Sequence, residues 1–139
     1  MEYVDLHSHS TASDGTFAPE AVVRLAADCG LAGLALTDHD TIAGIAAAAA
    51  EAARLGMDFI PGIEISAAYP DPGTLHILGY GINPASPVLR DMTKTLLQGR
   101  DDRNPKIIAK LQELGVAITM EEVEAQAAMG SGARASTMR

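Results

Sequence analysis

The chain has no tryptophan, and aromatic side chains make up 4% of its 139 residues. Its core therefore has to be built mainly from alanine, leucine, isoleucine and valine. Cys29 is the single cysteine, which excludes an internal disulfide and is typical of a reducing compartment. We expect a cytoplasmic protein whose length suits one domain.

Positive charge and long apolar runs are also scarce. Ten Lys and Arg face eighteen Asp and Glu, giving a formal net charge of −8. Duplex nucleic-acid binding needs clustered cations, so we expect no duplex partner, whereas carboxylates that bind metal cations fit this charge. The alanine-rich run 45–53 is interrupted by Glu51 and is too short to span a bilayer, so we expect no membrane partner.

Apolar periodicity predicts strands alternating with helices. Strands are expected at 3–9, 31–37, 57–66 (interrupted at Pro61 and Gly62) and 74–82. Helices are expected at 19–29 and from Asp40 or Thr41 to about Gly56. Two further helical pieces, 88–104 and 106–115, are expected to be divided near Pro105. A last helix is expected at 120–128, with Thr119 and Glu122 as a capping box. This order is typical of an α/β fold with a largely parallel sheet. Four strands are too few for an eight-stranded barrel, so the chain forms either a small open sheet or the front portion of a longer fold.

Two histidines, His7 and His9, are separated by one residue in the first predicted strand. Alternating strand residues point to the same face, so Asp5, His7 and His9 are expected together, with both imidazoles on one cation. Asp5 would then accept a hydrogen bond from a ligating ring. For this motif alone, a polar strand face in water is the more common explanation.

Other candidate ligands lie at or after strand ends, where α/β folds place their sites. Asp14 follows the first strand in a turn, where Asp before Gly is ordinary, and His39 lies between Asp38 and Asp40, which are candidate helix caps. Glu64 is either a carboxylate that bridges two metals or an edge residue in solvent. His76 is either a ligand or a core histidine.

The combination is more informative than any single residue. All four histidines fall on or just after predicted strands, with Asp14 and Glu64 at the same edge. Mixed imidazole and carboxylate ligands suit Zn, Mn or Fe.

Five motifs in order, DLHSHS, SDGT, TDHD, GIEIS and LHILGY, resemble those of the polymerase-and-histidinol-phosphatase (PHP) family of metal-dependent phosphoesterases. The resemblance covers roughly residues 2–125. Within the family, the chain is most similar to bacterial phosphatases that remove the 3′-phosphate from nucleoside 3′,5′-bisphosphates. The resemblance implies a distorted parallel β/α barrel with up to three divalent metal ions at the carboxyl ends of its strands.

The resemblance also implies roles for single residues. It makes His7, His9 and Glu64 ligands of one metal, Glu64 and His76 ligands of a second, and Asp14 and His39 ligands of a third. Asp14 and His39 are expected at the substrate phosphate as well, as are Arg100, Arg103 and Asn104. For the two arginines, a solvated helix with Asp101 and Asp102 as ion-pair partners is an equally good explanation.

Family members carry a later histidine and a C-terminal Asp-x-His, but no histidine follows His76 here. Ser136 follows Arg134 by two residues, where an Arg-x-His is expected. Each implied metal site therefore lacks at least one ligand. We expect the N-terminal part of the barrel, a partial PHP domain over 1–125, and a diverged or loose tail over 126–139.

The resemblance implies hydrolysis of a phosphomonoester by metal-activated water, on a small nucleotide such as a nucleoside 3′,5′-bisphosphate. The alternatives are a truncated or non-catalytic PHP remnant and a histidinol-phosphate phosphatase. Short length and acidic charge disfavour a DNA polymerase domain. The expected partner is a small phosphorylated substrate, and the oligomeric state stays open.

Overall fold

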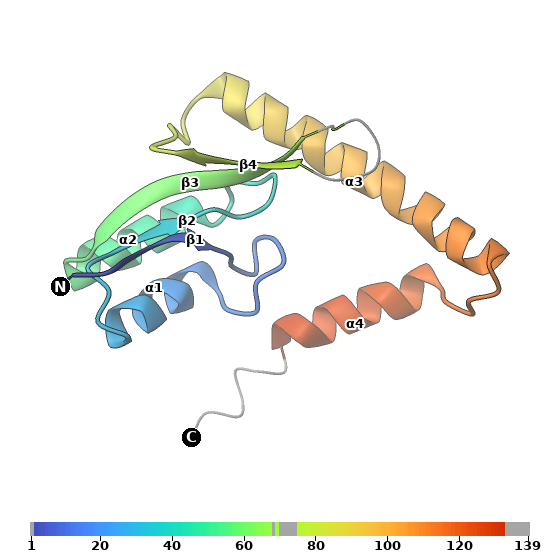
Figure 1. Cartoon of the computed structure of the whole chain (residues 1–139), viewed down its shortest axis with the longest axis horizontal. Coiled ribbons are helices and arrows are strands. Elements are labelled where there is room, and N and C mark those ends of the chain that lie inside the picture. Colours follow the sequence, from blue (N-terminus) through green and yellow to red (C-terminus); the bar gives the residue numbers. More distant parts are fainter. Residues whose placement is uncertain (1, 68, 70–74, 133–139) are drawn as a thin grey trace. The chain divides into compact units, whose positions relative to one another are not determined.

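The computed structural model describes residues 2–67, 69 and 75–132 (Figure 1). Arg134 and Ser136 lie outside these residues. The chain divides into two compact units, Met1–Lys94 and Thr95–Arg139. None of the helices in the described part is long and apolar enough to cross a membrane.

The first unit contains a curled sheet of four strands in the order β1-β2-β3-β4 (Figure 1). The strands are β1 (Val4–Ser8), β2 (Gly33–Leu36), β3 (Asp58–Ala67) and β4 (Leu75–Tyr80). β1, β2 and β3 are parallel, as predicted, whereas β4 is antiparallel to β3. Residues 68–74 are too few for the helical crossover that a parallel strand would need.

Two helices pack on one face of the sheet, α1 (Pro19–Asp28) and α2 (Ile45–Leu55). Pro19 occupies the first turn of α1, and Gly56 ends α2 with a left-handed φ of 67°, both as predicted. The core between helices and sheet is aliphatic, as the composition predicts. Its buried members are Val23, Ala26, Leu34, Leu36, Ile45, Ala48 and Ala52.

The predicted start of α2 is wrong. The helix begins at Ile45, and neither Asp40 nor Thr41 caps it. Asp40 has a left-handed φ of 56°, and its Oδ1 accepts the backbone N–H of Ser66 at 2.7 Å. Asp40 therefore holds the segment that follows β2 to β3, a long-range contact that local sequence does not encode.

The predicted interruption of β3 is also wrong, because the strand continues through Pro61 and Gly62. The Pro61 carbonyl accepts the N–H of Ile82 at 3.1 Å, and the β3–β4 pairs begin at Gly62. In a β-strand, the N–H and C=O of one residue point toward the same neighbouring strand, which for Pro61 is β4. The N–H that proline lacks would therefore point past the last β3–β4 pair, where the pairing has already ended.

α1 and α2 are joined by an ion-pair cluster around the buried Glu51 carboxylate. Arg24 of α1 donates to Glu51 Oε1 at 3.0 Å, and Arg54 donates to both carboxylate oxygens at 2.8 Å. The hydrogen bonds from Arg54, then from Arg24, lower the pKa of Glu51 from 4.5 to about 2 against the opposing effect of burial.

α3 (Pro87–Glu113) continues into the second unit, which also contains α4 (Met120–Gly132). The predicted division near Pro105 is wrong, because α3 runs through that residue. Pro105 deprives the Asp101 carbonyl of its helical partner, but Asp101 is exposed and water can hydrogen-bond to it.

The capping box is confirmed: Thr119 N–H donates to Glu122 Oε2 at 2.9 Å, and Glu122 N–H donates to Thr119 Oγ1 at 3.2 Å. α4 extends beyond the predicted residue 128.

Glu51→Gln should lower the urea midpoint of unfolding at neutral pH, because it removes a charged acceptor shared by α1 and α2. The carboxyl pKa is lower in the folded state than its ordinary 4.5. The stabilisation is therefore complete above pH 4.5 and is lost as the pH falls toward 2. The midpoint difference between wild type and Glu51→Gln should narrow from pH 6 to pH 3. A difference that stays constant over this range would contradict the assignment.

Candidate metal centre

A bulge in β1 turns His7 and His9 toward β3. Asp5 pairs with Leu34 and Ser8 with Leu36, so the register shifts by one residue between Asp5 and Ser8. The His7 N–H donates to Asp5 Oδ1 at 3.0 Å at this point. The prediction that Asp5 supports a ligating ring is therefore wrong. Asp5 instead pairs with Leu34, whose side chain lies in the helix-covered core, and both residues line a cavity of about 270 Å³ that Ser8 and His9 also line.

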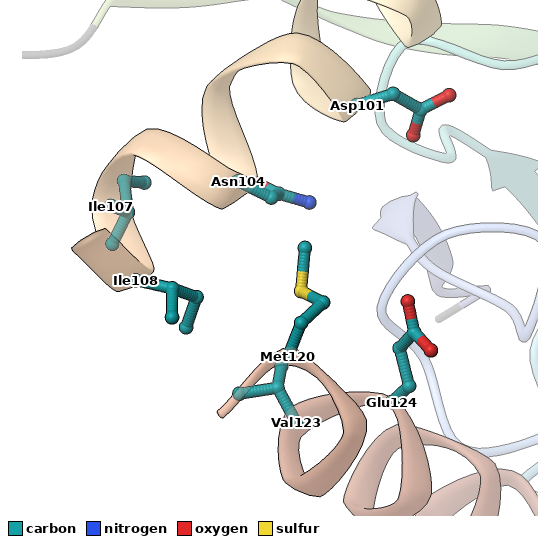
Figure 2. Close-up of a pocket in the computed structure, with 7 residues that line it drawn as sticks. All are labelled: Asp101, Asn104, Ile107, Ile108, Met120, Val123 and Glu124. Atoms are coloured by element: carbon teal, nitrogen blue, oxygen red, sulfur yellow. The ribbon is translucent and has the colours of Figure 1, made fainter. Parts of the chain in front are cut away.

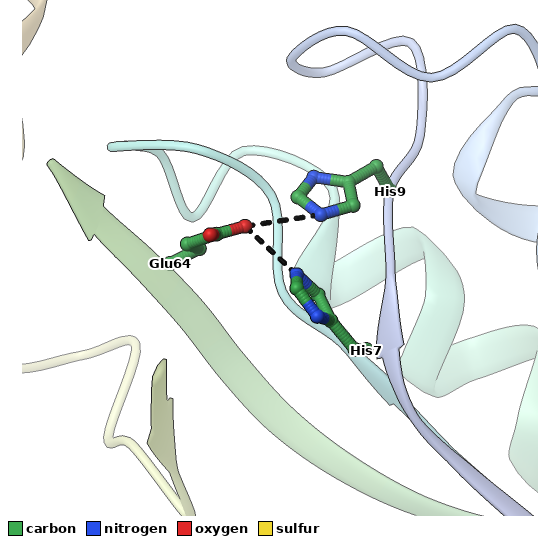
Figure 3. Close-up of side chains that lie close together, drawn as sticks. All are labelled: His7, His9 and Glu64. Carbon is green, nitrogen blue, oxygen red and sulfur yellow. Dashed lines mark hydrogen bonds and ion pairs between the residues drawn. The ribbon is translucent and has the colours of Figure 1, made fainter. Parts of the chain in front are cut away.

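Glu64 is the point at which the imidazoles converge. Its side chain is only 6% exposed, which excludes an edge carboxylate facing solvent. Glu64 Oε2 lies 2.9 Å from His7 Nε2 and 3.1 Å from His9 Nε2. Dashed lines mark both contacts in Figure 3. One carboxylate oxygen thus contacts both His7 of β1 and His9, which directly follows β1.

His39 reaches the same carboxylate from the end of β2. The backbones of His39 and Glu64 form a parallel bridge, with Glu64 N–H donating to the Asp38 carbonyl at 3.2 Å. His39 Nδ1 lies 3.5 Å from Glu64 Oε2. Its other nitrogen, Nε2, lies 3.6 Å from Asp14 Oδ2. His39 therefore stands between the two candidate carboxylates.

His76 contacts the other oxygen of Glu64, with its Nδ1 2.8 Å from Oε1. It pairs with Ser66 near the carboxyl end of β3, because β4 runs antiparallel. The His76 side chain is 38% exposed, which excludes a core histidine. The direction of β4 thus brings a residue at the start of a strand to the edge where the parallel strands end.

Asp14 completes the group from the loop after β1. Its Oδ1 lies 3.3 Å from His9 Nδ1, and its side chain is 66% exposed. The loop packs tightly, since a Cβ at Gly15 would lie 2.4 Å from the His9 carbonyl oxygen. The glycine of the SDGT turn is therefore required for close packing.

The donor atoms fit divalent metal ions. Three overlapping groups of candidate ligand atoms each lie within 4.8 Å of one another: His7, His9 and Glu64; His9, Asp14 and His39; His39, Glu64 and His76. Two ligand atoms that each lie about 2.1 Å from one ion are about 3.0 to 3.4 Å apart. The nitrogen-to-oxygen distances of 3.1 and 3.3 Å fall within this range, and those of 2.8, 2.9, 3.5 and 3.6 Å lie within about 0.2 Å of it.

Two buried nitrogens also make no hydrogen bond, the Nδ1 atoms of His9 and His39. Each has a carboxylate oxygen only at ion-pair distance, Asp14 Oδ1 at 3.3 Å and Glu64 Oε2 at 3.5 Å. Buried polar atoms are normally paired, so such exceptions call for an explanation such as a bound ion.

The electrostatics of Glu64 favour its charged form. Burial by itself raises the pKa of the Glu64 carboxyl. Hydrogen bonds with His7 and His76 and the charge of His39 outweigh burial and hold this pKa below its ordinary value. An ionised carboxylate is the form that binds metal.

The predicted phosphate-binding residues Arg100, Arg103 and Asn104 lie on α3 in the second unit. Asn104 lines a cavity of about 530 Å³ between α3 and α4 (Figure 2). Asp102, a suggested partner of the arginines, accepts a hydrogen bond from Gln98 at 3.0 Å. The substrate contact of these three residues stays a prediction. The other cavity-lining residues are Asp101, Ile107, Ile108, Met120, Val123 and Glu124.

Residues 5–124 match the PHP domain family. The chain belongs to this family. A 3′,5′-nucleoside bisphosphate phosphatase from Chromobacterium violaceum is 44% identical over 117 residues, covering 84% of this chain and 41% of the relative. A 5′-3′ exoribonuclease Rnm from Salmonella typhimurium is 41% identical over 111 residues, covering 78% of this chain and 38% of the relative.

A crystal structure of a protein described as a metal-dependent phosphoesterase, from Bifidobacterium adolescentis, has the same fold. It superposes with a TM-score of 0.80 at 31% identity, covering 91% of this chain and 43% of that protein. The curled sheet is therefore part of a PHP barrel, as predicted. The PHP chain described here spans about two fifths of the length of these relatives.

One residue near the centre, Asp38, was expected only as a possible helix cap. It is 1% exposed, and its carboxylate accepts hydrogen bonds from Ser10 and Ser13. Its place directly after a buried strand was the available signal.

Asp5→Ala should speed amide hydrogen exchange at His7, because it removes the acceptor that holds this N–H in the bulge. A net loss of about 1 kcal/mol corresponds to roughly fivefold faster exchange. Asp5→Asn keeps an oxygen acceptor and should stay close to wild type. Equal exchange in the alanine variant and wild type would show that Asp5 does not maintain the bulge.

Proposed function

We propose that this PHP domain binds divalent metal ions through His7, His9, Asp14, His39, Glu64 and His76 and hydrolyses a phosphate ester of a small nucleotide. One observation carries the proposal: four imidazoles approach the two oxygens of a single buried carboxylate, Glu64, at 2.8 to 3.5 Å. No other charge partner of Glu64 is found among the described residues. Without bound cations, four imidazole rings would surround the single negative charge of Glu64.

The six proposed ligands form three overlapping groups, each suited to one ion. Glu64 belongs to two ligand groups, one with His7 and His9 and one with His39 and His76, so its two oxygens are suited to bridge two ions. Asp14 serves a third group with His9 and His39. Zn, Mn and Fe all accept this mixture of nitrogen and oxygen ligands.

Phosphate monoesters hydrolyse extremely slowly without help, because the ester is negatively charged and neutral water is a weak nucleophile. Divalent ions supply charge neutralisation and a more acidic water when bound. Asp14 is the most exposed of the six proposed ligands, so the substrate phosphate would approach on its side of the centre. Arg100 and Arg103 are proposed to bind the remaining phosphate charge by paired hydrogen bonds.

The names of two relatives support the proposed substrate class. The Chromobacterium violaceum relative is named for nucleoside 3′,5′-bisphosphates and the Salmonella typhimurium relative for 5′-3′ exoribonuclease activity. Both names indicate nucleotide phosphate esters. The chain is strongly acidic, which favours a small nucleotide over a long polyanion.

Metal analysis tests the first part of the proposal. The purified chain, dialysed against Mn²⁺ or Zn²⁺ and then against buffer, should retain metal measurable by mass spectrometry. Glu64→Gln should lose more metal than His7→Ala, because Glu64 serves two groups. Glu51→Gln is the matched control: this buried carboxylate pairs with arginines and should leave metal content unchanged. A metal-free wild type, or equal loss in both glutamine variants, would contradict the proposed centre.

Phosphate release tests the second part. With Mn²⁺ added, the chain should release phosphate faster from a nucleoside 3′,5′-bisphosphate than from histidinol phosphate. A short 5′-phosphorylated RNA tests the exoribonuclease alternative in a parallel assay that measures released mononucleotides, because cleavage of its phosphodiester bonds frees no inorganic phosphate. Metal binding without hydrolysis of any of the three would favour the non-catalytic remnant.

A further inference from the structure

Asp38 is buried, and among the described residues the hydrogen bonds to its carboxylate come from one loop. It is 1% exposed, and it accepts hydrogen bonds from the Ser10 N–H, the Ser10 hydroxyl and the Ser13 hydroxyl, each at 2.7 Å. Such short bonds to a charged acceptor are among the stronger hydrogen bonds in proteins. The Asp38 side chain is therefore held in one position by its hydrogen bonds.

The loop that Asp38 holds lies between two proposed metal ligands, His9 and Asp14. The Ser13 hydroxyl, 2.7 Å from Asp38, also lies 3.3 Å from Asp14 Oδ1. The Ser10 carbonyl accepts the N–H groups of Ser13 at 3.0 Å and Gly15 at 2.9 Å, which closes the loop into a compact turn. Ser13 thus links the buried Asp38 carboxylate to the exposed Asp14 carboxylate.

The same carboxylate is adjacent in sequence to a third proposed ligand, His39. Asp38 therefore connects the loop that carries Asp14 to the strand end that carries His39. An exposed side chain such as Asp14 loses rotamer freedom on binding an ion, and a loop held in advance reduces that loss. Glu64 and His76 do not depend on such a loop for their position, because the β3–β4 ladder holds the backbone of both residues.

We propose that Asp38 and Ser13 are positioning residues for one metal position, the group of His9, Asp14 and His39, and not for the group of His39, Glu64 and His76. This inference rests on the proposed function, since it concerns how tightly one of the proposed ions is held. Ser13 transmits the effect, because its hydroxyl is the group that contacts both carboxylates.

Co²⁺ titration of the full chain, followed by its visible absorbance, measures each metal equivalent without relying on activity. Ser13→Ala removes one hydroxyl from a partly exposed turn and should fold normally, which a matching urea midpoint would verify. It should weaken one Co²⁺ equivalent by about 10- to 100-fold and leave the others unchanged. Ser13→Thr keeps the hydroxyl and should restore wild-type affinity. Glu51→Gln controls for a general loss of stability.

A double-mutant comparison ties the effect to Asp14. In an Asp14→Ala background, Ser13→Ala should cause no further loss of Co²⁺ affinity, because the ligand that it positions is gone. Three results would overturn the inference: unchanged Co²⁺ binding in Ser13→Ala, equal weakening of all equivalents, or the same loss in the Asp14→Ala background. A wild type that binds no Co²⁺ would remove the proposed function as well, so the two failures are distinguishable.

Discussion

The centre of this PHP domain depends on one buried carboxylate. Glu64 is placed by β3 beneath imidazoles that come from β1, from the end of β2 and from β4, so every strand of the sheet contributes to its surroundings. A charged carboxylate is unfavourable in the interior unless it is paired. The histidines meet that requirement, and divalent ions would meet it more completely. The need to pair the buried Glu64 carboxylate therefore determines both which side chains meet at this edge of the sheet and which ions the site can bind.

Two departures from regular structure create this geometry. The bulge in β1 reverses the side-chain alternation, so that Asp5 pairs with a core position while His7 faces Glu64. The antiparallel direction of β4 brings His76 to the edge where the parallel strands end. Regular alternation and an all-parallel sheet would have separated these side chains. Irregularities of this kind are common next to functional sites.

The aspartates that flank His39 hold the centre together. Asp38 binds the loop that carries Asp14, and Asp40 binds the Ser66 N–H of β3. Neither caps a helix, although both stand where a cap would be expected. Their buried carboxylates are satisfied by backbone and hydroxyl donors from other segments, which is how buried polar groups are usually accommodated.

The sequence by itself determined the α/β order, the aliphatic core, the capping box at Thr119 and the six candidate ligands, because each depends on local pattern or on residue type. The short connection before β4 also contained enough information to predict its antiparallel direction. Tertiary structure alone decided the direction of the Asp5 side chain, the continuity of α3 through Pro105 and the roles of Asp38 and Asp40. These features depend on register, solvent exposure and hydrogen bonds between residues more than twenty positions apart, which local propensity does not encode.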